Sequence, residues 1–308
     1  MKQVLLVVLF FFLNGLAFAI LVTQPSLNLS YHNGPILSRD PLEVHILFYG
    51  SFSHSQKAIV RAFLSSISTP TKAKDVFTVQ KWWSITRGYV DLSGSVVAQN
   101  VEISGESTDV YYRLGKILTT SNLTSLVLQY LQNSAASPNS LHLVVTAADV
   151  FVEGFCQDVC GQHLYTYPTV ETNWKMLPYA WVGNAESQCP TFCAWRYAKS
   201  KYGSPTKPLK APNGVGMDGL IFTLANVLVG VVTNPFQNAY YQGDASVVVE
   251  AVGACMDKHA LGFDPSYPDK ILKANKTGAS YNVHGIRSYK FLVPFIWNPQ
   301  THSCAIQP

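Results

Sequence analysis

Two stretches of the chain are apolar over the length of a strand. Residues 42–49 read Leu-Glu-Val-His-Ile-Leu-Phe-Tyr and end at Gly50, and residues 141–145 read Leu-His-Leu-Val-Val. Apolar runs of this length that are rich in β-branched or aromatic residues are typical of buried strands. The pattern therefore predicts two central strands of a sheet.

Apolar residues at helical spacing lie between these two runs. Ser53 and Gln56 form a capping-box pattern, after which apolar residues recur every three or four positions until Thr69-Pro70 stops the helix. Residues 121–134 show the same amphipathic spacing and lead directly into the second strand. Strands that alternate with helices predict an α/β fold in which helices cover one mixed sheet.

The second half of the chain is less regular. The segment 155–212 holds four cysteines, many aromatic residues and little helical period, and we interpret it as a disulfide-stapled insertion over the sheet. Residues 220–232 are apolar on nearly all sides, which predicts a buried helix with Asp218 as its N-terminal cap. Residues 289–297 predict a late strand, and Pro294 favours an edge position because it cannot donate to a central ladder.

The N-terminus has the pattern of a secretory signal peptide. Lys2 precedes an apolar run over residues 4–13, and Ala17-Phe18-Ala19 then meets the small-x-small cleavage rule. We predict a signal peptide over residues 1–19 and a single domain over residues 20–308. The run 220–232 is too short to span a bilayer, so we expect no membrane span after cleavage and an extracellular location.

Two further features fit the secretory route. Six cysteines, an even number, most simply form three disulfides in an oxidising compartment, although their spacing does not determine the pairing. A zinc site is the disfavoured alternative, because secreted thiols tend to oxidise and zinc ribbons use Cys-x2-Cys. The chain also carries three Asn-x-Ser/Thr sequons for glycosylation. The cysteines are Cys156, Cys160, Cys189, Cys193, Cys255 and Cys304, and the sequon residues are Asn28, Asn122 and Asn275.

Charge and motifs exclude several classes of function. Only 13% of the residues are charged and the net charge is +4 without a basic cluster, so nucleic acid is not an expected partner. The chain lacks the Gly-x-Ser-x-Gly elbow, the P-loop and the dinucleotide fingerprint, so esterase, NTPase and dinucleotide-dependent activities have no support. No local zinc motif is present, and we expect no metal and no cofactor.

Several histidines and a pair of tryptophans are candidate site residues. We interpret His163 as a hydrogen-bonded core residue rather than a ligand, and His45 and His142 as isolated residues on the predicted strands. Trp82-Trp83 form either a platform that stacks on sugar rings or part of the core, and the core is the commoner place for such residues.

A series of short motifs runs through the chain. They are Tyr-His-Asn-Gly-Pro at 31–35, Phe-Tyr-Gly at 48–50, Trp-Trp at 82–83, the Cys-to-His stretch at 156–163, Leu-Pro-Tyr-Ala-Trp-Val-Gly-Asn at 177–184, Cys-Pro-x-x-Cys-Ala at 189–194, Asp-Gly at 218–219, Thr-Asn-Pro at 233–235 and Tyr-Asn-Val-x-Gly-Ile-Arg at 281–287. In content and order, this series resembles the plant EXORDIUM-like (phosphate-induced) protein family. The resemblance implies an apoplastic or cell-wall glycoprotein that is linked to brassinosteroid-dependent growth and cell expansion.

The resemblance breaks at the apolar helix. Typical family members carry a His-Glu-x-x-Glu stretch just before Thr-Asn-Pro, which resembles the metal helix of zinc peptidases. Here the three corresponding positions hold Asn226, Val227 and Gly230. A metallopeptidase needs ligands on one helix face and a Glu that activates water, so the comparison implies that this divergent member has lost them.

The sequence predicts the surroundings of three residues in or near this helix. Asn226 is expected to find a hydrogen-bond partner in the core, because an unpaired buried amide costs about 1–3 kcal/mol. Gly230 predicts the close approach of another element, which would compensate its poor helix propensity. Glu250 is the acid that remains downstream, and we interpret it as hydrogen-bonded structure rather than a ligand.

The leading hypothesis is a secreted, non-catalytic, EXORDIUM-like glycoprotein that acts in growth regulation through an extracellular partner, either a cell-wall glycan or a receptor ectodomain. The alternative is a secreted hydrolase, metallopeptidase-like or directed at wall polysaccharide. That alternative requires an open cleft in which Glu250, His163 and a further acid or histidine converge.

Overall fold

A computed structural model describes residues 29–70, 76–131, 139–199, 207–244, 248–255 and 271–308. The predicted signal peptide over residues 1–19 and the sequon at Asn28 lie outside these described residues.

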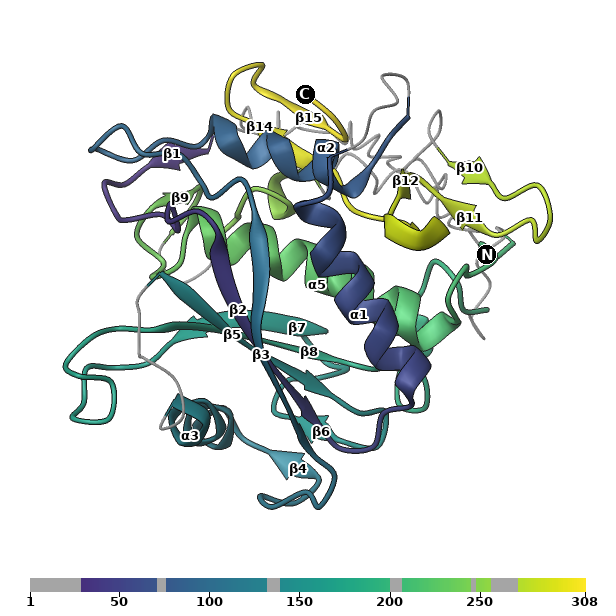
Figure 1. Ribbon diagram of the computed structural model, residues 1–308, viewed down its shortest axis with the longest axis horizontal. Coiled ribbons are helices and arrows are strands. Elements are labelled where there is room, and N and C mark those ends of the chain that lie inside the picture. The colour runs from purple at the N-terminus through teal and green to yellow at the C-terminus, as the bar shows by residue number, and fades with distance from the viewer. Residues whose placement is uncertain (1–28, 71–75, 132–138, 200–206, 245–247, 256–270) are drawn as a thin grey trace, which may run out of the picture.

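A five-stranded mixed sheet forms the centre of the molecule (Figure 1). Its first four strands run parallel, and the last one pairs antiparallel with its neighbour. Both predicted central strands are confirmed, and every residue of the second is buried, as expected for a strand covered on both faces. In spatial order the strands are β3 (Val101–Asp109), β2 (Leu42–Tyr49), β5 (Ser140–Thr146), β8 (Pro178–Gly183) and β7 (Gly161–Tyr165).

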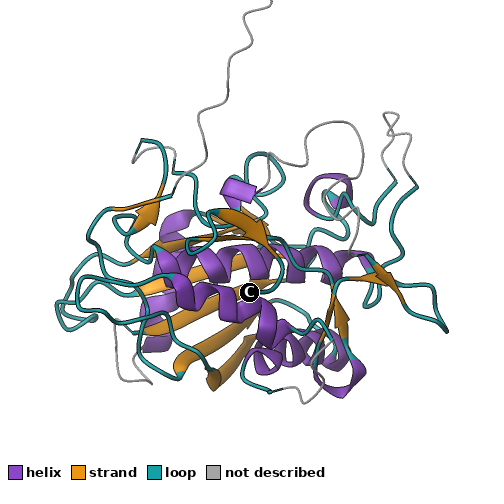
Figure 2. Ribbon diagram, turned by 90° about the horizontal axis from the view of Figure 1, so that it is seen from above, coloured by secondary structure: helices purple, strands orange, loops and turns teal. Residues whose placement is uncertain are grey.

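One face of the sheet is covered by the helices α1 (His54–Ile67) and α5 (Val215–Thr233), and α2 (Val79–Ser84) packs on α1 (Figures 1 and 2). The capping box of α1 is confirmed: the Ser53 hydroxyl accepts from the Gln56 N–H, and the Gln56 side chain accepts from the Ser53 N–H. Two reciprocal bonds of this kind satisfy donors that the first helical turn leaves unpaired.

The helix α5 is the most apolar element of this layer. It is long and apolar enough to cross a membrane by length and composition, but 89% of its most apolar window is buried inside the protein. The prediction of a buried core helix is therefore confirmed. Its start differs from the prediction, because the helix begins at Val215 and Asp218 lies within the first turn, where it accepts hydrogen bonds from the Asn213 N–H and amide.

The opposite face carries α3 (Thr120–Leu131), which is the observed form of the helix predicted over residues 121–134. Leu123, Leu126 and Val127 pack from it onto side chains of β2 and β5. Residues 132–134 of the predicted helix lie outside the described residues.

Short elements surround the two layers. They are β1 (Ser30–Tyr31), η1 (Ile85–Gly88), β4 (Ile117–Leu118), β6 (Phe151–Val152), α4 (Pro190–Cys193), β9 (Tyr240–Tyr241), η2 (Gly253–Cys255), β10 (Leu272–Lys273), β11 (Ser280–Tyr281), β12 (Val283–His284), η4 (Ile286–Ser288), β13 (Lys290–Phe291), β14 (Ile296–Asn298) and β15 (Ser303–Ala305).

Two sequence-based placements need correction. The segment 155–212 is disulfide-stapled as predicted, but it is more than an insertion over the sheet, because it supplies the sheet strands β7 and β8. The single late strand predicted over residues 289–297 is two separate strands, β13 and β14. Pro294 lies between them, where its missing N–H interrupts no ladder.

All six cysteines form disulfides. The pairs are Cys156–Cys189, Cys160–Cys193 and Cys255–Cys304. The first two are parallel links, because both ends are spaced by four residues, and they fix the start of β7 against α4. The alternative of a cysteine zinc site is therefore excluded for these residues.

Trp82 and Trp83 belong to the core. Both rings are buried, and their indole N–H groups donate to the Pro294 and Ala98 carbonyls. The sugar-stacking alternative for this pair is wrong, since a buried ring presents no face to a ligand.

Candidate functional site

The helix α5 comes closest to its surroundings at Gly230. A Cβ atom at this position would lie 2.6 Å from the Glu250 Oε2 and 3.0 Å from the His163 Cδ2. Both distances are too short for a side chain without a shift of these neighbours. The predicted close approach at Gly230 is confirmed, and it brings together residues from α5, from β7 and from the segment before η2.

His163 and Glu250 form a nearly buried pair beside Gly230. The His163 Nε2 lies 2.9 Å from each carboxylate oxygen of Glu250, and the two side chains are 8% and 19% exposed. The Asn234 amide, at the C-terminal end of α5, donates a further bond of 2.8 Å to the Glu250 Oε1. The prediction that Glu250 is hydrogen-bonded is thus confirmed.

The electrostatics favour a charged Glu250. Burial alone would raise the pKa of its carboxyl, but attraction to His163 and the hydrogen bonds from His163 and Asn234 outweigh it, so that the pKa lies below its usual value. A carboxylate held in this way contributes stability above the pKa of the unfolded state, and this contribution is lost as the pH falls through the lower folded-state pKa.

Asn226 lies one helical turn before Gly230, and its surroundings differ from the prediction. Its side chain is only half-buried and lines a pocket of about 420 Å³ between α5, the start of β7 and α4. Solvent can therefore reach its amide, and the expected partner in the core is not needed. The space around Asn226 is open rather than filled.

Aromatic side chains form part of the wall of this pocket. Phe192 and Trp195 line it and are 44% and 47% exposed. The Arg196 guanidinium lies 4.3 Å from the Trp195 ring centroid and 3.7 Å from that of Phe222, within the range of cation–π attraction. We call the space lined by Phe192, Trp195, Arg196, Phe222 and Asn226 the aromatic pocket.

Metal ligands are scarce in this region. His163 and Glu250 are the two side chains with ligand chemistry that meet at Gly230, and they bond to each other. Among the described residues there is no group of three or more His, Cys, Asp or Glu side chains that could hold a metal ion. Neither His163 nor Glu250 lines the aromatic pocket.

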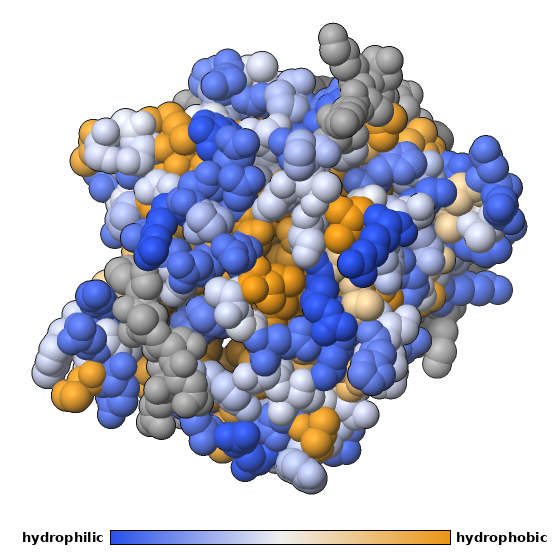
Figure 3. Space-filling model, in the orientation of Figure 1, coloured by the Kyte–Doolittle hydropathy of each residue, from blue (hydrophilic) through white to orange (hydrophobic). Residues whose placement is uncertain are grey.

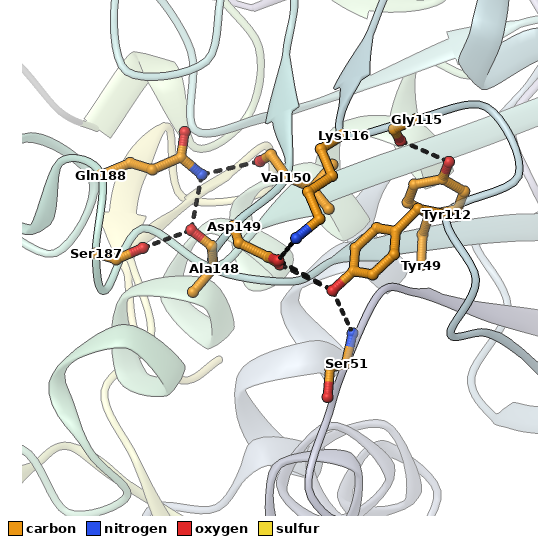
Figure 4. Close-up of polar contacts among 10 residues, drawn as sticks. All are labelled: Tyr49, Ser51, Tyr112, Gly115, Lys116, Ala148, Asp149, Val150, Ser187 and Gln188. Atoms are coloured by element: carbon orange, nitrogen blue, oxygen red, sulfur yellow. Dashed lines mark hydrogen bonds and ion pairs between the residues drawn. The ribbon is translucent and has the colours of Figure 1, made fainter.

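A second polar cluster lies where the parallel strands β2 and β5 end (Figure 4). The Tyr112 hydroxyl donates to the Asp149 carboxylate at 3.0 Å and accepts from the Ser51 N–H at 3.3 Å. The Lys116 ammonium bonds to Asp149 at 2.5 Å and lies 4.5 Å from the Tyr112 ring centroid. The carboxyl ends of parallel strands often bind ligands, but here the charges pair with each other and tie the loop after β3 to the loop after β5.

The two described sequon residues differ in their surroundings. Asn275 is exposed in the turn between β10 and β11. Asn122 is half-buried in the first turn of α3, where its side-chain oxygen accepts from the Thr119 N–H and hydroxyl. The side-chain oxygen of Asn122 is therefore part of the N-terminal cap of α3.

Sequence reasoning missed two features of these sites. Asn234 was noted only within Thr-Asn-Pro, and its bond to Glu250 depends on a loop that returns to the end of α5. His45 and His142 were judged isolated, but β2 and β5 pair in a register that places them side by side. The matching patterns Val-His-Ile-Leu and Leu-His-Leu-Val in two parallel strands were the available signal.

Comparison with known proteins gives the family. Residues 29–307 match the conserved region of phosphate-induced protein 1. The protein PHOSPHATE-INDUCED 1 of Nicotiana tabacum is 38% identical over 288 residues, which cover 92% of this chain and 90% of that protein. Among proteins of Arabidopsis thaliana, EXORDIUM-like 2 is 37% identical (96% and 95% covered) and EXORDIUM is 36% identical (90% and 88% covered).

No solved structure matches the chain. The family match spans nearly the whole length over which the structure is described, and the relatives are covered almost end to end. The chain therefore belongs to the phosphate-induced protein 1 family, which the EXORDIUM resemblance of its motifs had indicated.

Proposed function

We propose that this chain is a secreted, apoplastic, disulfide-bonded glycoprotein that regulates plant growth, cell expansion and development by binding an extracellular partner, without catalysis. The names EXORDIUM and PHOSPHATE-INDUCED 1 of its relatives are consistent with a plant growth-related family. The link to brassinosteroid-dependent growth is part of this proposal and rests on the family resemblance. Three disulfides are compatible with an oxidising compartment.

The proposal that the protein acts without catalysis is supported by the geometry at Gly230. A Glu that activates water needs a free carboxylate oxygen near the reacting centre. The Glu250 carboxylate instead accepts from His163 at both oxygens and from Asn234 at one. Gly230 and Asn226 contribute neither a carboxylate nor an imidazole to the helix face beside it.

The aromatic pocket supports a binding role. Exposed aromatic rings are suited to stack on the apolar faces of sugar rings, with polar groups at the rim for orientation. Phe192 and Trp195 provide such rings, and Asn226 provides an amide beside them. These features favour a cell-wall glycan over a receptor ectodomain as the partner at this pocket.

A secreted hydrolase is the second candidate, and one observation favours it. The pocket at Asn226 is open and lies along the same face of α5 as the His163–Glu250 pair, which is part of the arrangement that a hydrolase needs. Asp158 is the acid among the described residues that line this pocket, but the bonds of Glu250 in the described structure go to His163 and Asn234 and not to Asp158.

The test is the metal content of the full chain, expressed with its own N-terminus and recovered from the culture medium. We expect less than about a tenth of an equivalent of any transition metal after dialysis without chelator, because two mutually bonded ligands do not make a closed site. About one equivalent that disappears in Glu250→Gln would overturn the non-catalytic proposal and favour the hydrolase. Protein that stays inside the cells would contradict secretion.

A further inference from the structure

A cavity of about 270 Å³ lies between the sheet and α3, on the face of the sheet opposite to α5. Figure 3 shows this side of the molecule hollowed where Figure 1 places the sheet above α3. The cavity is closed from α3 by Leu126 and Val127. The polar residues of its wall are His45, His142, Ser104, Glu106, Ser107 and Tyr130. This cavity shares no lining residue with the aromatic pocket.

A bulge in the edge strand β3 shapes the cavity. Val44 pairs with Ile103 but His45 pairs with Gly105, so that Ser104 is the extra residue. Its hydroxyl lies 3.1 Å from the His45 Nε2. Gly105 leaves room for the imidazole, since a Cβ there would lie 2.8 Å from the His45 Nδ1. Bulges of this kind redirect side chains and are frequent beside binding sites.

Two imidazoles form the floor of the cavity. His45 and His142 are paired residues of β2 and β5, and their rings stack with centroids 5.1 Å apart. His142 is 4% exposed, and its Nε2 is buried without a hydrogen-bond partner. A buried polar atom left in this state costs roughly 1–3 kcal/mol, and because water does not reach this atom in the free protein, a ligand recovers that cost by turning the His142 ring so that its Nε2 faces the cavity.

Among the described residues that line the cavity, no formal charge is unpaired. Burial, with a smaller contribution from His45, lowers the pKa of His142 to about 3, and burial also lowers the pKa of His45, so both rings are neutral near neutral pH. The Glu106 carboxylate is paired with Arg61 by two bonds of 2.9 and 3.0 Å. A charged ligand would lose its hydration and find no counter-ion here.

We propose that this cavity is a binding site for a small uncharged molecule that consists of one ring and carries a hydroxyl group. Its volume exceeds that of the ~150 Å³ cavity known to hold benzene and lies just below the ~300 Å³ at which pockets for drug-sized ligands begin. A hydroxyl both donates and accepts, so it satisfies the His142 Nε2 in either tautomer. Leu126, Val127 and Val144 offer the ring an apolar wall.

Catalysis by the same residues is less well supported. Ser104 and His45 are within reach of each other, as a nucleophile and its base must be. Within the described part of the chain, however, no carboxylate accepts a hydrogen bond from the His45 ring to orient it. The geometry favours recognition of a hydroxyl over its activation.

The proposal is tested by calorimetric titration of the full secreted chain with four matched probes: benzyl alcohol, toluene, benzoate and benzylamine. Benzyl alcohol is expected to bind, with toluene about tenfold weaker because His142 then stays unpartnered, and the two charged probes weaker still. Xylose is titrated alongside: tighter binding than benzyl alcohol that is lost in Val127→Phe assigns the ligand of this cavity to neutral sugars, and weaker binding assigns it to aromatic alcohols. Absence of binding by every uncharged probe, or a charged probe that binds most tightly, would overturn the proposal.

Three variants locate the binding. Val127→Phe fills the cavity from α3 and is expected to abolish binding, whereas Gln129→Phe, an exposed position on the same helix, is expected to leave it unchanged. The His142→Leu variant is expected to bind toluene and benzyl alcohol with equal affinity. Equal loss in Val127→Phe and Gln129→Phe would show that the probes bind elsewhere. If His142→Leu fails to fold, the Phe pair still decides the outcome.

Discussion

Gly230 fixes how closely the His163–Glu250 pair can approach α5. Glycine in a helix interior costs about 1 kcal/mol relative to alanine, so its presence in a core helix needs a compensation. The compensation is visible in the space that a Cβ would occupy, which is filled by the Glu250 carboxylate and the His163 ring. The family resemblance implies that an acid was lost at position 230. In this chain the packing of Glu250 and His163 requires a residue without a side chain there.

Gly230→Ala is expected to lower the free energy of unfolding by roughly 1–3 kcal/mol, although alanine is the better helix former. The added methyl group must displace a buried carboxylate that is bonded to His163 and Asn234. Denaturant unfolding followed by circular dichroism measures the change. Gly253→Ala is the matched control, since its Cβ would meet only Val249 at 3.6 Å. A stabilised Gly230→Ala would contradict the packing argument.

At the scale of elements, two disulfides tie the start of β7 to α4. Cys156 and Cys160 precede the strand; of their partners, Cys189 precedes α4 and Cys193 is its last residue. The two links close overlapping stretches of chain, residues 156–189 and 160–193, and the sequence separation of the partners is 33 in each case. When one disulfide has formed, the ends of the long loop are already held together. The second disulfide then closes only a short ring made of the four-residue spacings at the two ends.

The two links are therefore expected to be strongly non-additive. Removal of either pair alone, as Cys156→Ala with Cys189→Ala or as Cys160→Ala with Cys193→Ala, should cost about 1–2 kcal/mol. Removal of both should cost about 4–6 kcal/mol, which exceeds the sum of the two single losses, because the chain then also loses the closure of the long loop, worth roughly 3–4 kcal/mol in the chain-entropy treatment. Unfolding in urea of the two double variants and the quadruple variant measures this. Additive losses would mean that each link acts through its own local contacts.

The same scale shows why some elements escaped prediction. The strands β7 and β8 read Gly-Gln-His-Leu-Tyr and Pro-Tyr-Ala-Trp-Val-Gly, which are short and lack a clear alternation. Their strand character comes from pairing with each other and of β8 with β5, and from the disulfides at their ends. Long periodic segments such as α1 and β2 were predictable because their own pattern already specifies a buried face.

At the scale of the whole molecule, two buried groups act on stability with opposite dependence on pH. Burial raises the pKa of Asp218 from 3.8 to about 7 against the hydrogen bonds from Asn213, so between these values the folded state holds a proton that the unfolded state releases. Its contribution to the unfolding free energy falls as the pH rises through this window. For His142 the pKa falls from 6.5 to about 3, the folded state excludes a proton, and its contribution rises with pH.

Between about pH 4 and pH 6.5 these two slopes oppose each other, each by up to about 1.4 kcal/mol per pH unit. In Asp218→Asn the unfolding free energy is expected to rise with pH more steeply than in the unmodified protein. In His142→Leu it is expected to rise less steeply or to fall. Urea unfolding at several pH values in this window measures the slopes, with the exposed Asp158→Asn as control. Parallel profiles for all four proteins would contradict the assignment of the two groups.

The sequence by itself determined the α/β class, the two central strands, the amphipathic helices and the family, since these depend on periodicity and on motifs that are local in the chain. It also marked Gly230 and Glu250 as residues that need a structural account. Only the tertiary structure decided that Glu250 bonds to His163, that Asn226 faces an open pocket, and that His45 lies against His142. Those contacts join residues far apart in sequence, and their geometry depends on strand register and on returning loops, which no local pattern encodes.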